Sequence, residues 1–176
     1  MPLRSIAEFF SPYASDVVDF IPGNVQTIHH VGPGKASPII CFDLVDDQLI
    51  RSIAMKGNLL LVQTNSATFG LSAQSEQELA MVRIRAVEHQ RNAISISTVG
   101  VSAIIDSNGK IAQKTEINRA EVMQQEITLI NSHSIADKLG NSAEILMILF
   151  MILAYLLLPL LKLRNRRMTQ HQEWGI

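Results

Sequence analysis

The sequence predicts a layered α/β domain followed by a single membrane-spanning helix. Short apolar runs alternate with helix-like segments up to about residue 90, and a series of strand-like runs follows them. Near the C-terminus, residues 145–161 form a run of seventeen residues without a charge. A chain of 176 residues can form one domain with a sizeable core, and two domains are not expected.

The first strands and the first helix follow from local signals. Residues 37–44 form a short apolar run, which is typical of a buried strand. Asp46 and Asp47 then provide N-cap character for a helix through Met55. A further apolar run, residues 58–64, predicts a second buried strand.

A second helix and a group of strands complete the predicted domain. Ser75 and Glu78 have the spacing of a capping box, so a helix is expected to extend from there to about Gln90. Residues 106–110, DSNGK, predict a hairpin turn. Strands are expected around this turn and before it, at residues 93–100, 101–106 and 111–117.

Composition and charge exclude several classes of function. The formal net charge is -1 and the isoelectric point is about 6.5, whereas a general nucleic-acid binder normally carries a basic stripe. The sequence contains one cysteine, so no intrachain disulfide can form. His29 and His30 are adjacent but lie among glycines and a proline, which indicates an exposed loop rather than a metal site. We therefore expect no nucleic-acid partner, no metal and no cofactor.

The apolar run at residues 145–161 is expected to cross a membrane. Lys162 can extend its charged end toward the lipid headgroups, so that Leu163 lengthens the run to roughly 26 to 29 Å at about 1.5 Å per residue. A bilayer core is about 30 Å thick. A buried core helix would have to be apolar on all sides, Pro159 included, in a chain too small to surround it. We therefore expect a transmembrane helix over residues 144–163.

The charges that flank this helix predict the orientation of the chain. Lys162 begins the basic segment KLRNRR, and basic residues normally stay on the cytoplasmic side. Residues 164–176 are therefore expected in the cytoplasm, and the domain, residues 1–140, on the outer side of the membrane. The first thirty residues do not resemble a signal peptide, because they contain no long apolar segment. This mismatch leads us to expect that the chain lacks its N-terminal part.

Cys41 is the residue that most needs an explanation. It lies at the C-terminal end of a predicted strand and just before a helix, which is where α/β sheets present reactive side chains. A helix N-terminus favours the thiolate form, but Asp43, Asp46 and Asp47 oppose it unless they are paired. A free cysteine is also among the most buried residue types. Position alone leaves a nucleophile and a core cysteine about equally well supported.

Motifs along the chain resemble those of one enzyme family. The segment PIICFD resembles the nucleophile segment of the nitrilase, or carbon-nitrogen hydrolase, superfamily. More closely, the chain resembles the C-terminal part of the apolipoprotein N-acyltransferase family over roughly residues 1–167. The final apolar helix with its basic end resembles the last membrane span of that family. The other matching segments, in the order of the family, are MPLRS, DFIPGN, TNSATFG, LAMVRIRAVEHQRN and STVGVSAIIDSNGK.

This resemblance implies a fold, a reaction and a set of site residues. The fold would be a nitrilase-like α-β-β-α sandwich, partial because its N-terminal strands are missing, followed by one C-terminal transmembrane helix. The reaction would transfer an acyl chain from a phospholipid, through a cysteine thioester, to the diacylglyceryl-cysteine of a lipoprotein, at the outer face of the bacterial cytoplasmic membrane. Cys41 would be the nucleophile, and Asp43, where the family has Glu, a supporting carboxylate. The substrate loop would include Asn65, Phe69 and Gly70.

Two catalytic residues of the family have no counterpart in this sequence. A Glu that acts as general base and a Lys that stabilises the oxyanion both lie upstream of the segment that matches Met1. The 176-residue chain alone is therefore expected to be inactive. Two alternatives remain open: a membrane-tethered carbon-nitrogen hydrolase that acts on small amides, and a non-catalytic membrane-anchored domain.

Overall fold

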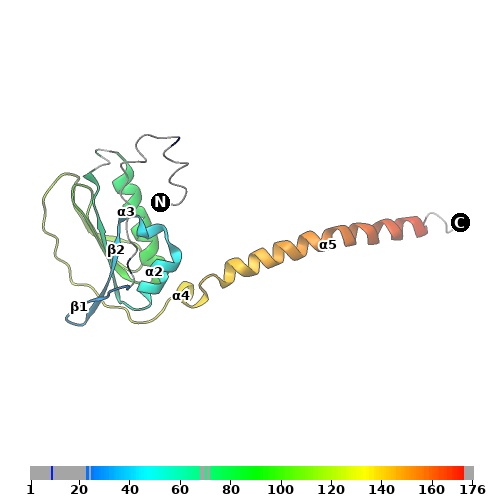
Figure 1. The fold of residues 1–176 in the computed structure, drawn as a ribbon, viewed down its shortest axis with the longest axis horizontal. Coiled ribbons are helices and arrows are strands. Elements are labelled where there is room, and N and C mark those ends of the chain that lie inside the picture. The colour runs from blue at the N-terminus through cyan, green and yellow to red at the C-terminus, as the bar shows by residue number, and fades with distance from the viewer. Residues whose placement is uncertain (1–8, 10–22, 24, 68–69, 71, 173–176) are drawn as a thin grey trace.

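A six-stranded mixed sheet forms the centre of the domain in the computed structural model, which describes residues 9, 23, 25–67, 70 and 72–172 (Figure 1). The strands lie side by side in chain order. β2, β3 and β4 are parallel to one another, and the other neighbours pair antiparallel. The strands are β1 (His29–Val31), β2 (Gly34–Ile40), β3 (Leu59–Thr64), β4 (Asn92–Ser97), β5 (Ala103–Ile105) and β6 (Ile111–Lys114).

Helices α2 (Asp47–Ala54) and α3 (Gln74–His89) cover one face of this sheet (Figure 1). Parallel neighbours need a crossover connection, and each of these helices provides one. The apolar core consists of Ile39, Leu44, Ile50, Ile53, Ala54, Leu60, Val62, Leu79, Val82, Ala86, Ala93, Val101, Ala103 and Ile105. Burial of these side chains is the main term that holds the helices on the sheet.

The carboxyl ends of the three parallel strands lie together at one edge of the sheet. β2 ends at Ile40, which lies opposite Gln63 of β3. Thr64, the last residue of β3, lies opposite Ser97 of β4. The segments that follow these strands therefore meet at the same edge, which is where open α/β sheets bind their ligands.

The first helix begins as predicted, whereas the strand before it ends earlier than expected. β2 stops at Ile40, because the next five residues form the short 3-10 helix η2 (Cys41–Val45). Asp46 then caps α2, and its side chain accepts a hydrogen bond from Leu49 N at 2.9 Å. The cysteine consequently lies in a turn rather than in the strand.

Two other local predictions were wrong. Ser75 does not cap α3, because it lies inside the helix and its hydroxyl accepts a hydrogen bond from Val101 N at 2.7 Å. The Ser75 hydroxyl therefore binds the loop after β4 and is not available to cap the helix. His29 and His30 are exposed, but they lie in strand β1 rather than in a loop, since they pair antiparallel with β2.

The C-terminal part of the chain leaves the domain as a long helix. Residues 115–133 contain neither a helix nor a strand, and they lead to the short helix α4 (Ile135–Leu139). After Gly140 the chain forms α5 (Ser142–Gln172), 31 residues long, which projects away from the sheet (Figure 1).

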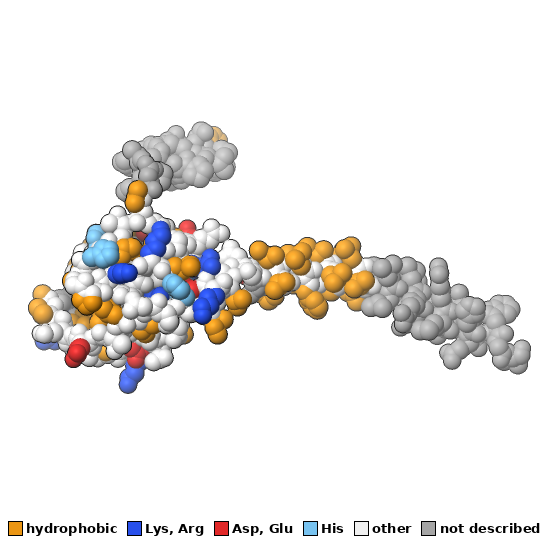
Figure 2. All heavy atoms as spheres, turned by 90° about the horizontal axis from the view of Figure 1, so that it is seen from below, with side chains coloured by type: hydrophobic (Ala, Val, Ile, Leu, Met, Phe, Trp, Pro, Cys, Tyr) orange, Lys and Arg blue, Asp and Glu red, His pale blue; other side chains and the backbone are white. Residues whose placement is uncertain are grey.

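Large apolar side chains are exposed along the described part of α5. From Ile145 to Leu158 they are between 44% and 77% exposed, and Figure 2 shows them along the visible face of the helix. Within the residues that the structure describes, no helix reaches the length and apolarity needed to cross a membrane. The span expected over residues 144–163 therefore stays a prediction.

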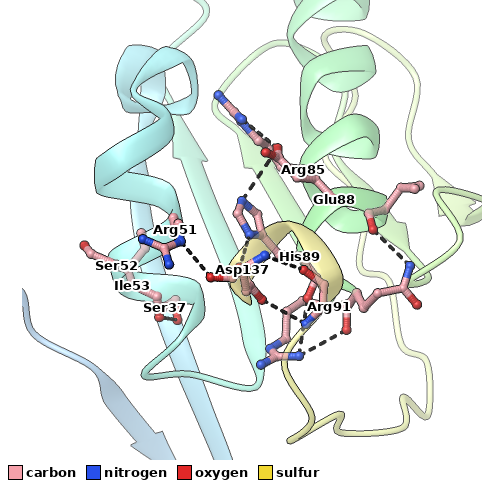
Figure 3. A network of polar contacts seen from close by, with 12 residues as sticks. Ser37, Arg51, Ser52, Ile53, Arg85, Glu88, His89, Arg91 and Asp137 are labelled. Carbon is pink, nitrogen blue, oxygen red and sulfur yellow. Dashed lines mark hydrogen bonds and ion pairs between the residues drawn. The ribbon is translucent and has the colours of Figure 1, made fainter. Parts of the chain in front are cut away.

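A buried polar network holds α4 against the rest of the domain (Figure 3). Asp137 of α4 is fully buried, and its Oδ1 lies 2.6 Å from Nδ1 of His89 at the end of α3. Arg51 of α2 donates from Nε to the carbonyl oxygen of Asp137 at 2.8 Å. Arg91, also buried, donates from Nη1 to the carbonyl oxygen of Ser132 at 2.6 Å. Burial lowers the pKa of Arg91 from its usual value, and the charge of Asp137 partly offsets this effect.

Candidate functional site

Cys41 lies in a tight turn at the carboxyl edge of the parallel strands. It is the first residue of η2, directly after β2, and it is partly exposed. Its φ angle is +50°, a left-handed conformation that residues other than glycine adopt at an energetic cost. Residues held in such conformations cluster at active sites. Exposure and conformation together distinguish Cys41 from an ordinary core cysteine.

The three carboxylates that follow the cysteine each have a partner. Asp43 turns back along the chain, and its Oδ2 accepts a hydrogen bond from Ile40 N at 3.2 Å. Asp46 caps α2, and Asp47 Oδ1 lies 2.5 Å from Nη2 of Arg85. The acidic segment therefore does not present three unpaired charges to the thiol. In this geometry Asp43 closes the turn that holds the cysteine.

Arg85 of α3 connects the cysteine turn to two helices. Its Nε donates to the carbonyl oxygen of Leu44 in η2 at 2.8 Å. Nη1 donates to Glu88 at 2.6 Å, and Nη2 donates to Asp47 at the start of α2 at 2.5 Å. Burial alone lowers the pKa of Arg85, but hydrogen bonds and charges from Glu88 and Asp47 outweigh burial and raise the pKa overall. Arg85 is therefore a charged link between η2, α2 and α3.

A cavity of about 370 Å³ opens beside Cys41, within the size range of small-molecule sites. η2 contributes Cys41 and the exposed Phe42 to its wall. α3 contributes Gln74, Gln77, Glu78 and Met81. The Glu78 carboxylate accepts a hydrogen bond from Oγ1 of Thr64, the last residue of β3. The cavity thus combines a thiol, an anchored carboxylate and apolar groups.

Of the loop residues predicted from the sequence, Asn65 and Gly70 are described by the structure, and neither is among the residues that line this cavity. Asn65 Oδ1 accepts hydrogen bonds from Thr98 Oγ1 at 2.8 Å and from Ala67 N at 3.1 Å, so its side chain orders the loop that follows β3. Gly70 is exposed, with φ +56°, and is not among the residues that line the cavity. Phe69 lies outside the described residues.

Hydroxyl groups join the loops after β3 and β4. Ser66 Oγ and Ser97 Oγ lie 2.8 Å apart, and Ser97 Oγ accepts a hydrogen bond from Gly100 N at 3.0 Å. A Cβ atom at Gly100 would lie 2.3 Å from Ser75 Oγ and 2.7 Å from Ser97 Oγ. A side chain at this position would therefore displace these hydroxyl groups.

The largest cavity among those described is not the one with reactive groups. It measures about 660 Å³ and lies between the outer side of α3 and the turn at Asn108 and Gly109, without a nucleophilic side chain in its wall. Within the described ranges, no three His, Cys, Asp or Glu side chains are grouped as a metal ion would require. We therefore take the smaller cavity at Cys41 as the candidate active site.

Comparison with protein families decides the family of this domain. The profile of the family described as carbon-nitrogen hydrolase matches residues 8–136, which is most of the chain. The chain belongs to the carbon-nitrogen hydrolase family. The predicted nitrilase-like α/β fold is thereby confirmed, and its sheet is mixed. The part of the chain that the structure describes contains one sheet of the predicted sandwich.

Two solved structures align with part of this chain. Saccharomyces cerevisiae Nit3, a member of branch 10 of the nitrilase superfamily, aligns with 57% of this chain and 40% of its own, at 23% identity and a TM-score of 0.47. The carbon-nitrogen hydrolase from Helicobacter pylori G27 aligns with 57% of this chain and 43% of its own, at 16% identity and a TM-score of 0.49.

Curated relatives of this chain are apolipoprotein N-acyltransferases, so the resemblance noted in the motifs is confirmed. The enzyme of Geobacter metallireducens is 29% identical over 142 residues, which are 80% of this chain and 27% of the relative. The enzyme of Rickettsia prowazekii is 29% identical over 166 residues, which are 92% of this chain and 33% of the relative. The enzyme of Azotobacter vinelandii is 32% identical over 127 residues, which are 72% of this chain and 24% of the relative. The chain thus spans about a quarter to a third of the length of these relatives.

Sequence reasoning did not identify Glu78, Thr64 or Arg85 as residues of the site. Glu78 was interpreted as part of a capping box, although the spacing of residues 74, 78, 81 and 85 places them on one face of a helix. That periodicity could have pointed to the side of α3 that lines the cavity. The contacts of Thr64 and Arg85 depend on packing between distant segments, and no local signal predicts them.

Proposed function

We propose that this member of the carbon-nitrogen hydrolase family is an N-acyltransferase with Cys41 as its nucleophile. The observation that carries the proposal is the position of Cys41, in a left-handed turn at the edge of three parallel strands and in the wall of a cavity. Similarity to apolipoprotein N-acyltransferases favours acyl transfer over the hydrolysis of small amides. The apolar side chains of Phe42 and Met81 suit an acyl chain beside the thiol.

The proposed reaction has two steps that share a thioester intermediate. First, the Cys41 thiolate attacks the ester carbonyl of a phospholipid; a C–S bond forms, the C–O bond breaks, and the released lysophospholipid oxygen takes a proton. Second, the α-amino group of a diacylglyceryl-cysteine lipoprotein attacks the thioester. A C–N bond then forms, the C–S bond breaks and the thiol is restored. Neither step needs a metal or a cofactor.

The first test detects the intermediate and the product. We expect the protein expressed from its natural gene, mixed with phosphatidylethanolamine labelled in its acyl chain, to acquire label that hydroxylamine releases. On addition of a diacylated lipopeptide with a free α-amino group, the label should move to the lipopeptide. Hydrolysis of small amides without transfer to the lipopeptide would favour the alternative hydrolase. Absence of both thioester and acylated lipopeptide would contradict the proposal.

We also propose that the protein acts at the bacterial cytoplasmic membrane. The exposed apolar side chains of α5 and the basic segment that begins at Lys162 support this location. The domain, residues 1–140, would lie on the outer side, residues 144–163 in the membrane and residues 164–176 in the cytoplasm. Both proposed substrates are membrane molecules, so they would reach the cavity from the bilayer.

A reporter fusion tests this orientation. We expect alkaline phosphatase fused after Ile176 of the natural protein to be inactive, because the basic segment keeps the C-terminus in the cytoplasm, where that enzyme does not form its disulfides. Green fluorescent protein at the same position should fluoresce. As a matched control, alkaline phosphatase inserted after Ser107, in the β5–β6 turn, should be active. Phosphatase activity from the fusion at Ile176 would refute the orientation.

A further inference from the structure

Glu78 is the one charged residue among the described side chains that line the Cys41 cavity. Cys41 comes from η2 and Glu78 from α3, and both border the same space of about 370 Å³. The other lining side chains are neutral amides or apolar groups, namely Phe42, Gln74, Gln77 and Met81. A ligand bound beside the thiol therefore meets a single negative charge.

The Glu78 carboxylate is held in place from the sheet. Thr64 donates from Oγ1 to Glu78 Oε1, and Thr64 is itself buried at the carboxyl end of β3. Its backbone oxygen accepts a hydrogen bond from Thr98 N at 3.2 Å, which ties it to the segment after β4. Glu78 Oε2 has no hydrogen-bond partner among the described residues. A fixed carboxylate with one free oxygen is an acceptor for N–H donors, and it binds charged donors most strongly.

The two steps of the proposed reaction differ in the charge of the group that enters the cavity. The phospholipid ester that reacts first is neutral at its reacting carbonyl. The amine that reacts second is largely protonated at neutral pH, because the pKa of an α-amino group is about 8. A carboxylate beside the thiol favours the binding of an ammonium group and gives a neutral ester no comparable interaction. The charge in this cavity therefore suits the second step.

We propose that Glu78 binds the amine of the acyl acceptor beside Cys41, an inference that rests on the N-acyltransferase function proposed above. Glu78 Oε2 accepts a hydrogen bond from the bound ammonium group. One ammonium proton leaves to solvent, and the resulting amine attacks the carbonyl carbon of the Cys41 thioester. The C–N bond forms and the C–S bond breaks. A second nitrogen proton passes to the departing sulfur, which leaves an amide and a free thiol.

The test measures the two half-reactions of the natural gene product separately, in detergent micelles. Thioester formation is followed with acyl-labelled phosphatidylglycerol, whose headgroup carries no amine, in the absence of an acceptor. Transfer is followed with a diacylated lipopeptide that carries a free α-amino group. We expect Glu78→Gln to form the thioester at the wild-type rate and to transfer the acyl chain about 10- to 100-fold more slowly. Hydrolysis of the thioester by water should not change, so the ratio of aminolysis to hydrolysis should fall.

Two further variants separate this role from a structural one. Glu76→Gln makes the same change on the same helix, but Glu76 pairs with Lys114 at 2.7 Å and does not line the cavity, so both half-reactions should match the wild type. Thr64→Val keeps the carboxylate and removes the hydroxyl that fixes it. This variant should slow aminolysis less than Glu78→Gln does and leave thioester formation unchanged. It also tests the role of the carboxylate if Glu78→Gln folds poorly.

Specific outcomes would overturn the inference. Aminolysis at the wild-type rate in Glu78→Gln would show that the carboxylate does not bind the amine. Loss of thioester formation in a folded Glu78→Gln protein would assign Glu78 to activation of the thiol instead. Failure of the wild-type protein to form any thioester would refute the proposed N-acyltransferase function itself. This result can be distinguished from the two results for Glu78→Gln, because it concerns the wild type.

Discussion

Replacing Cys41 with alanine is expected to abolish acyl transfer while the protein still folds. The thioester requires the sulfur, and loss of a catalytic nucleophile typically lowers the rate by about 10⁴-fold or more. Cys41 is partly exposed and lies in a turn, so removal of the sulfur should cost only about 1 kcal/mol of the free energy of unfolding. The measurement is acylation of the lipopeptide, together with the thermal unfolding of each purified variant.

The conformation of Cys41 supplies a second variant for this prediction. Because φ is +50°, glycine adopts this turn with less strain than alanine does. We expect Cys41→Gly to be inactive and slightly more stable than Cys41→Ala, by up to about 1 kcal/mol. If both variants are inactive although they differ in stability, the loss of activity comes from the missing thiol and not from unfolding. Normal turnover by either variant would rule out Cys41 as the nucleophile.

The elements predicted correctly are those that depend on neighbouring residues. Asp46 caps α2 through Leu49 N, three residues away, and the hairpin turn closes with Gly109 N bonded to the carbonyl oxygen of Asp106 at 2.9 Å. Hydrogen bonds between residues three positions apart can be predicted from the sequence without knowledge of the fold. The nitrilase-like fold followed from motifs in a fixed order, which carry more information than any single element.

The predictions that failed depend on contacts between distant residues. The apolar run at residues 37–44 was expected to continue as a strand, but Arg85 donates to the carbonyl oxygen of Leu44 and the run ends in η2. Ser75 has the spacing of a cap, yet its hydroxyl is used by Val101. In both cases tertiary hydrogen bonds override a local preference.

The sequence predicts one residue of the candidate cavity, Cys41, because the motif around it is a local feature. Its role as the nucleophile stays a prediction. The carboxylate of Glu78 reaches the same cavity because α3 packs on the sheet and Thr64 anchors it. These residues are 37 and 23 positions from Cys41 in the chain, by subtraction of their numbers. Only the fold brings them together at one edge of the sheet.

Replacing Asp137 with alanine is expected to destabilise the domain by about 2–5 kcal/mol, because it leaves buried polar groups of His89 and Ser134 without their hydrogen-bond partner, at about 1–3 kcal/mol each. Asp137 is fully buried, with Oδ1 at 2.6 Å from His89 Nδ1 and Oδ2 at 3.2 Å from Ser134 N. Nε2 of the buried His89 has no hydrogen-bond partner among the described residues. The bond to Asp137 is therefore the hydrogen bond of the imidazole ring, whose Nε2 also lies 3.7 Å from Glu88 Oε2. The alanine variant would leave Nδ1 without a partner in the interior.

Thermal unfolding followed by circular dichroism would measure this loss, with Lys138→Ala as the matched control. Lys138 is the next residue in α4 and is exposed, so its replacement should change stability by no more than about 0.5 kcal/mol. The double variant Asp137→Ala with His89→Ala should lose less than the sum of the two single losses, because removing the ring also removes the unpaired Nδ1. Additive losses would show that the two side chains act independently. An Asp137→Ala protein as stable as Lys138→Ala would show that the network does not hold α4, and with it the start of α5, against α3.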